Sequence, residues 1–210
     1  PICASTDAQT KKDASNPTQF QKIRHPKSPR YLAIPKVSSE RRQFIPIGYL
    51  DNDVICGDKI FFVDDASLFT FGVLTSTMHN AWMRQTCGRL ESRYSYSNTI
   101  VYNNYPWPGF ADEPLSEKHR AGIEQAAQGV LDARAQFAGA SLADLYDPLS
   151  MPPALLKAHQ KLDAAVDAAY VPSGGKKAYA SDAERVAFLF ELYQRITSLL
   201  PPTSKKQRKA

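Results

Sequence analysis

The sequence has 210 residues, of which 43% are hydrophobic, enough for one or two domains with a buried core. Its formal net charge of +5 favours a polyanionic partner without identifying one. No run of about 18 apolar residues is present, so no membrane-spanning helix is expected, and the polar N-terminus predicts a cytoplasmic protein. The cysteines Cys3, Cys56 and Cys87 lack close spacing, which predicts free thiols rather than a disulfide framework or a zinc site.

Residues 1–29 are polar and contain three prolines, which predicts a linker or the truncated start of a domain. Short apolar runs rich in β-branched and aromatic residues follow, separated by turn-forming stretches. They cover residues 31–37, 44–50, 54–56 and 60–63. They predict a small sheet in which Pro35 and Pro46 lie at edges or bulges.

A helix is expected next, because apolar residues recur at helical spacing between Leu68 and Trp82. Residues 64–67 offer N-cap candidates, and Gly88 is a plausible stop. Gly72 weakens the middle, so two shorter helices are possible. Residues 89–102 favour strand or extended loop, and the proline-rich stretch 105–109 predicts a domain boundary.

The second half has the pattern of helices. Apolar stripes cover residues 123–137, 155–169 and 186–200, and capping boxes begin at Ser141 and Ser181. The predicted fold class is therefore α+β, with a small mixed α/β domain over residues 30–108. A helical bundle of about three main helices follows over residues 109–200, and residues 201–210 form a basic, disordered tail.

Catalytic patterns are missing from the sequence. None of its four histidines lies in a metal-spacing cluster, and structural roles are expected for His79 and His159. No glycine-rich phosphate loop follows a strand, and no serine, histidine and aspartate have a recognisable nucleophile context. We therefore expect that this chain performs no bond chemistry itself.

Basic and polar residues around Glu91 suggest a nucleic-acid contact. Arg84, Arg89 and Arg93 surround Glu91, and Tyr, Ser and Asn are dense in the following residues. Residues two apart on an extended segment point to the same side, so Glu91 and Arg93 could contact the two bases of one C·G pair. The alternative is an exposed ion pair, which contributes only about 0 to 1 kcal/mol. Tyr94, Tyr96 and Tyr102 are more often packing residues of a sheet.

A second basic position lies in a predicted turn between strands. Arg41 and Arg42 follow Ser38 and Ser39, and two arginines beside hydroxyl groups suit phosphate contacts. A solvated turn is an equal alternative.

Long ordered motifs give a family resemblance. One runs Cys87-Gly88-Arg89-Leu90-Glu91-Ser92-Arg93-Tyr94, and the others lie at residues 38–50, 55–58, 71–76, 78–84 and 101–108. Together, over about Tyr31 to Leu200, they resemble the C-terminal part of MmeI-like adenine-specific DNA methyltransferases, the single-chain Type II restriction-modification group. In that family a target recognition domain precedes a small helical domain.

The resemblance implies that the pair Glu91 and Arg93 reads one base pair of double-stranded DNA. It also implies that the S-adenosylmethionine-binding methyltransferase domain lies in an absent upstream part, as does any nuclease. The chain itself is then expected to hold no cofactor, and its partners are DNA and that domain, in a bacterial cytoplasm.

The complete set of expected contacts has two parts. Base contacts are expected from Asp58, Lys59, Glu91, Ser92 and Arg93. Backbone contacts are expected from Lys36, Ser38, Ser39, Arg41, Arg42, Arg84 and Arg89. The competing interpretation is a protein-interaction fragment whose helical bundle docks a partner; an independent nuclease is disfavoured because no carboxylate-lysine or metal cluster is present.

Overall fold

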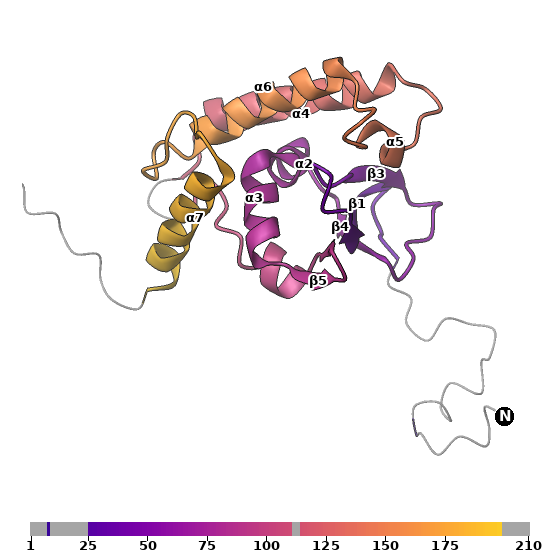
Figure 1. Cartoon of the computed structure of the whole chain (residues 1–210), viewed down its shortest axis with the longest axis horizontal. Helices are drawn as coiled ribbons and strands as arrows, with labels where there is room; N and C mark the ends of the chain where they lie inside the picture. Colours follow the sequence, from indigo (N-terminus) through magenta and orange to yellow (C-terminus); the bar gives the residue numbers. More distant parts are fainter. Residues whose placement is uncertain (1–7, 9–24, 111–113, 199–210) are drawn as a thin grey trace, which may run out of the picture.

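A computed structural model describes residues 8, 25–110 and 114–198. The predicted linker and the basic tail lie outside these residues, apart from residue 8 and residues 25–29. The mixed α+β class is confirmed, with short antiparallel strands first and a helical region after them (Figure 1). The elements are β1 (Arg30–Pro35), β2 (Val37–Ser38), β3 (Gly48–Asp51), β4 (Ile60–Asp64), α2 (Leu68–Thr75), α3 (Thr77–Thr86), β5 (Gly88–Leu90), β6 (Arg93–Ser95), the π-helix η2 (Asn98–Tyr102), α4 (Glu117–Ala135), α5 (Leu142–Leu145), α6 (Pro153–Ala169) and α7 (Asp182–Thr197).

The strands form two small antiparallel sheets, with the orders β3-β1-β4 and β2-β6-β5. The apolar runs at 31–37 and 60–63 became strands, but the run at 54–56 did not. Its side chains stay outside the core, with Ile55 72% exposed, so pairing there would bury no apolar surface. Only the end of the run 44–50 is strand, since Pro46 cannot donate to a ladder; Phe44, Ile45 and Ile47 are nevertheless buried.

The predicted helix of residues 68–82 is two helices, and the break is at Ser76 rather than at Gly72. Ser67 caps α2 and accepts a bond from the Thr70 N–H at 3.2 Å, as expected. Ser76 ends α2 and caps α3. Gly72 has a different role, because a Cβ there would lie 2.8 Å from Ile123 Cγ2 of α4. The glycine thus allows α2 and α4 to approach closely.

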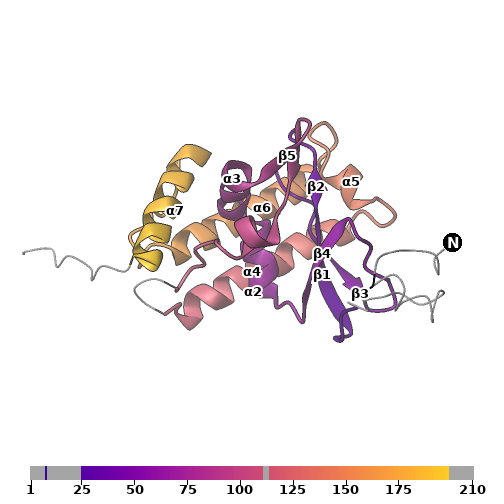
Figure 2. The same cartoon turned by 90° about the horizontal axis from the view of Figure 1, so that it is seen from below.

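The helical region differs in detail from a three-helix bundle. Helices α4 and α6 pack side by side and cover α2, whereas α7 packs against α3 (Figures 1 and 2). The strand β5 lies on the side away from the α4–α6 layer (Figure 1). One buried cluster includes residues of both halves, from Leu32 to Leu192. The helical half therefore supports the strands and α3 directly.

Candidate nucleic-acid interface

Strands β5 and β6 form a hairpin whose tip is Glu91 and Ser92. Leu90 pairs with Arg93, so the two tip residues form the turn, and both are exposed. Glu91 has φ of 57°, a left-handed conformation that few non-glycine residues adopt. The prediction of an extended segment was therefore wrong at Glu91, because the chain reverses there. The side chains still meet, with Arg93 Nη2 donating to Glu91 Oε2 at 2.6 Å.

Arg89 stiffens this hairpin from its other strand. Its Nη1 donates to the Ser92 carbonyl at 3.0 Å, and its guanidinium lies 4.1 Å from the centre of the Tyr94 ring. Tyr94 and Tyr96 are buried, and Tyr102 is half-buried, in line with the expected packing roles. Arg89 thus holds the hairpin tip in place, while the side chains of Glu91 and Ser92 are exposed to solvent.

The loop after β2 adjoins the hairpin. Ser38 pairs with Tyr94 in the ladder, and continuing this register brings Ser39 towards Arg93. Arg41 is exposed, and its N–H is bonded to Ser39 Oγ at 3.3 Å. Arg42 is half-buried, with Nη2 3.5 Å from the carbonyl of Ala143 in α5. Ser38 is buried, so of the two predicted serines only Ser39 is placed to contact a phosphate.

Lys36 connects the two sheets and lies beside Lys59. Its N–H donates to the Lys59 carbonyl at 2.9 Å, and its own carbonyl accepts from the Tyr96 N–H at 2.8 Å. Its ammonium group lies 4.6 Å from the centre of the Phe61 ring. Asp58 and Lys59 form an exposed ion pair of 3.2 Å. The two strand residues Val37 and Ser38 separate Lys36 from Ser39, which makes three residue steps or about 10 Å of extended chain.

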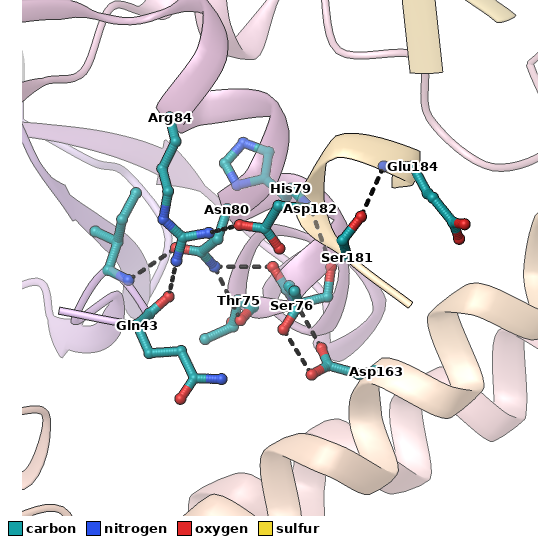
Figure 3. A network of polar contacts seen from close by, with 12 residues as sticks. Gln43, Thr75, Ser76, His79, Asn80, Arg84, Asp163, Ser181, Asp182 and Glu184 are labelled. Carbon is teal, nitrogen blue, oxygen red and sulfur yellow. Dashed lines mark hydrogen bonds and ion pairs between the residues drawn. The ribbon is translucent and has the colours of Figure 1, made fainter. Parts of the chain in front are cut away.

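Arg84 is placed differently from the other predicted residues. Its Nη1 donates to Asp182 Oδ2 of α7 at 2.7 Å, and its Nη2 donates to the Gln43 carbonyl (Figure 3). The side chain is 19% exposed, so its guanidinium is engaged inside the protein rather than presented beside Glu91.

Two anchoring residues were missed by the sequence analysis. Asn80 Oδ1 accepts from the Ile45 N–H at 2.9 Å, and Arg134 Nη1 of α4 donates to the Ile47 carbonyl at 2.9 Å. Both hold the segment between β2 and β3. The signal for Asn80 was a polar residue on an otherwise apolar helix face; for Arg134 the sequence offers none.

Comparison with known proteins assigns both halves. Residues 3–109 match the family model "MmeI, target recognition domain", and residues 115–201 match "MmeI, C-terminal domain". The chain belongs to the MmeI family. It is 38% identical over 193 residues to "DNA methyltransferase A" of Bacillus subtilis (strain 168), covering 92% of this chain and 21% of that protein.

A solved MmeI structure has the same fold as this chain. It is described as the Type IIL restriction-modification enzyme MmeI in complex with DNA, and it matches with a TM-score of 0.84 at 48% identity. The match covers 94% of this chain and 25% of the solved one. The chain thus spans about a quarter or less of the length of these two relatives.

Within the described part of this MmeI-family chain, the ionisable groups in the core have structural roles. His79 Nδ1 lies 2.8 Å from the Leu74 carbonyl and Nε2 lies 3.1 Å from the Tyr96 hydroxyl, and burial lowers its pKa to about 4. Burial likewise lowers the pKa of His159 to about 3, and its Nε2 lies 2.7 Å from the Tyr146 hydroxyl. Both histidines are fully buried, as their expected structural roles require, but the buried Nδ1 of His159 has no hydrogen-bond partner among the described residues.

No other reactive group is assembled in the described ranges. Cys56 and Cys87 are free thiols whose pKa values are raised by burial. Residues 25–110 and 114–198 contain no group of histidines, cysteines and acids that could hold a metal ion. None of their helices is long and apolar enough to cross a membrane.

Proposed function

We propose that this chain is the DNA sequence-recognition module of an N6-adenine methyltransferase of a restriction-modification system. The observation that carries the proposal is the Glu91–Arg93 pair at an exposed hairpin tip, joined by a 2.6 Å bond and held on a left-handed turn residue. Left-handed conformations at non-glycine residues cluster at functional sites, where the surrounding structure maintains them. The names of the relatives, a DNA methyltransferase and a DNA-bound restriction-modification enzyme, support the same assignment.

A two-stranded ribbon of this kind fits the major groove of B-form DNA. There the Glu91 carboxylate accepts from the cytosine amino group, and the Arg93 guanidinium donates to guanine. Each good contact discriminates between bases by about 1 to 3 kcal/mol. Since the two side chains already lie together, little side-chain ordering remains to be done when they meet one base pair. Ser92 shares the tip, and we extend base contacts to Asp58 and Lys59.

Backbone contacts are proposed for basic groups around the tip. Arg41 and Arg89 are exposed near it, whereas Arg42 and Lys36 are half-buried and offer only part of their side chains. Such contacts position the module without carrying sequence information.

The methyl transfer itself is assigned to residues outside this sequence. A groove between α4 and α6 is lined mainly by alanine, glycine and lysine, with no aromatic residue for the cofactor's adenine. It does not fit S-adenosylmethionine. Because the chain spans 21% and 25% of its relatives, we propose that the methyltransferase domain of the same full-length protein is its second partner. A bacterial cytoplasmic location accords with the Bacillus relative.

The test exchanges the two charges at the hairpin tip. We expect Glu91→Lys combined with Arg93→Asp, in the full-length protein, to change the methylated sequence at one position. Sequencing of the modified genome measures the change. The matched control is Asp132→Lys with Lys157→Asp, an exchange of exposed charges beside the α4–α6 groove that should leave the site unchanged. An unaltered target for the tip exchange would refute base contact by this pair.

A further inference from the structure

Helix α3 lies between the two segments proposed to face DNA. Its last residue, Thr86, is followed by Cys87 and then by β5, so the helix leads directly into the hairpin. The face of α3 that carries Asn80 and Arg84 contacts the loop that follows β2, at Gln43 and Ile45 (Figure 3). The β2–β6 ladder holds the start of the loop against the hairpin, and α3 holds its later part at Gln43 and Ile45.

Two side chains of α3 fix that loop by its backbone. Asn80 accepts from the Ile45 N–H at 2.9 Å, and Arg84, one turn later on the same face, donates to the Gln43 carbonyl. Asn80 is itself fixed, because its amide donates to the Thr75 and Ser76 carbonyls at 3.2 and 2.8 Å. The loop residues just after Arg41 and Arg42 are thus attached to α3 at two points.

The helical half holds α3 at both ends. At the N-terminus, Asp163 of α6 accepts from the Thr77 N–H and from the Thr77 hydroxyl, each at 2.6 Å. At the C-terminal end, Asp182, the first residue of α7, accepts from Arg84 at 2.7 Å. One guanidinium therefore joins three segments, namely α3, α7 and the loop.

We propose that Arg84 is a positioning residue rather than a phosphate contact. Together with Asp182 it places the Arg41 loop relative to the Glu91–Arg93 hairpin tip. The helix α7 then contributes to DNA recognition without touching DNA. This inference rests on the proposed function of the hairpin.

The two possible roles of Arg84 predict different effects of substitution on DNA binding. If Arg84 met a phosphate, Lys in its place would keep the positive charge and most of the binding, and Gln would lower the salt dependence of binding by about one counterion. A positioning role needs the planar guanidinium group, which donates to Asp182 and to the Gln43 carbonyl at the same time. Lys lacks this geometry. For Asp182→Asn, simple electrostatics predicts stronger DNA binding, since a negative charge is removed, whereas loss of positioning predicts weaker binding.

The experiment measures binding of the full-length protein to cognate and scrambled duplexes across a range of salt concentrations. We expect Arg84→Lys and Asp182→Asn each to weaken cognate binding by about tenfold, the effect of 1.4 kcal/mol. Binding to the scrambled duplex should change less than about twofold. The salt dependence of DNA binding by Arg84→Gln should stay at the wild-type value. Asp182→Glu should recover cognate binding, because it restores the carboxylate.

A substitution elsewhere in α7 serves as the control for these variants. Glu184→Gln, in the same first turn of α7, should bind like the wild type, and urea unfolding should show that every variant remains folded at the assay temperature. Wild-type binding by Arg84→Lys, or tighter binding by Asp182→Asn, overturns the positioning role. If the tip exchange changes the methylated site while these variants bind normally, only this inference fails. If the tip exchange also changes nothing, the proposed function fails as well.

Discussion

Glu91 combines an unfavourable backbone conformation with an exposed side chain. Among the described non-glycine residues, only Asp65 and Glu91 have positive φ. The left-handed region costs a non-glycine residue about 1 to 2 kcal/mol, and glycine would avoid this cost. Folding therefore does not require glutamate at this hairpin tip, and its presence is better explained by what its carboxylate contacts.

Glu91→Gly separates folding from recognition. We expect the free energy of unfolding to change by less than about 1 kcal/mol, because relief of backbone strain is offset by the greater freedom of glycine in the unfolded chain. Discrimination at the base pair that Glu91 contacts should fall by about 1 to 3 kcal/mol. Urea unfolding and competition binding with single-base-pair variants of the site measure the two effects.

Ser92→Gly is the control for Glu91→Gly. Ser92 is next in the turn but does not have positive φ, so glycine brings no strain relief there. Ser92→Gly should lower the free energy of unfolding modestly, and the Glu91–Arg93 pair should still discriminate between base pairs. Full discrimination by Glu91→Gly would instead mean that the carboxylate is dispensable.

At the scale of elements, periodicity located most of the fold. The runs at 31–37 and 60–63 and the stripes of α4, α6 and α7 had the right periods, because each buries one face against a neighbour. The break at Ser76 was missed, since a serine inside an apolar run is tolerated in a helix as well as at a cap. Nothing local indicated the π-helix Asn98–Tyr102 or the packing of α7 on α3, which depend on contacts between distant segments.

The candidate site was likewise only partly predicted from the sequence. The chemistry of Glu91 and Arg93 was evident from residue types two positions apart, and the structure brings them together although the local conformation differs. The engagement of Arg84 was not evident, because its partner Asp182 lies 98 residues away and an arginine near other arginines suggests a shared role. The local sequence therefore predicts the chemistry of a residue well, but it predicts contacts between distant residues poorly.

Gly72 gives an element-scale prediction. Its Cβ would lie 2.8 Å from Ile123 Cγ2 and 3.1 Å from Ala127 Cβ. We expect Gly72→Ala to destabilise the fold by about 1 to 3 kcal/mol, because the separation of α2 and α4 must increase. This outweighs the gain of about 1 kcal/mol in helix propensity. The midpoint of urea unfolding measures it.

Gly129→Ala is the matched control, also within a helix. A Cβ at Gly129 of α4 meets nothing within 4 Å, so only the propensity gain applies and the variant should be more stable than the wild type. Equal stabilisation by both substitutions would contradict close packing of α2 on α4.

At the scale of the whole molecule, the predicted boundary at residues 105–109 does not divide the core. Tyr105 and Tyr170 share a 2.8 Å bond between their hydroxyls, and Trp82 of α3 packs against Phe190 and Tyr193 of α7. The buried Asp167–Arg185 pair, at 2.9 Å, joins α6 to α7 beneath them. Because the halves share their apolar contacts, neither would keep its full core if the other unfolded.

The whole described region is therefore expected to unfold as one cooperative unit. In a protein of these 210 residues, Trp107→Phe leaves Trp82 as the only tryptophan, and its fluorescence reports the contact between α3 and α7. Leu155→Ala in α6 removes a fully buried side chain and should cost about 2 to 5 kcal/mol. In the Trp107→Phe background, this distant substitution should shift the Trp82 transition in urea as far as the circular dichroism transition. A Trp82 transition that stays in place while the helical signal shifts would mean that the two halves fold independently, and α7 could not then hold the recognition loop through Arg84.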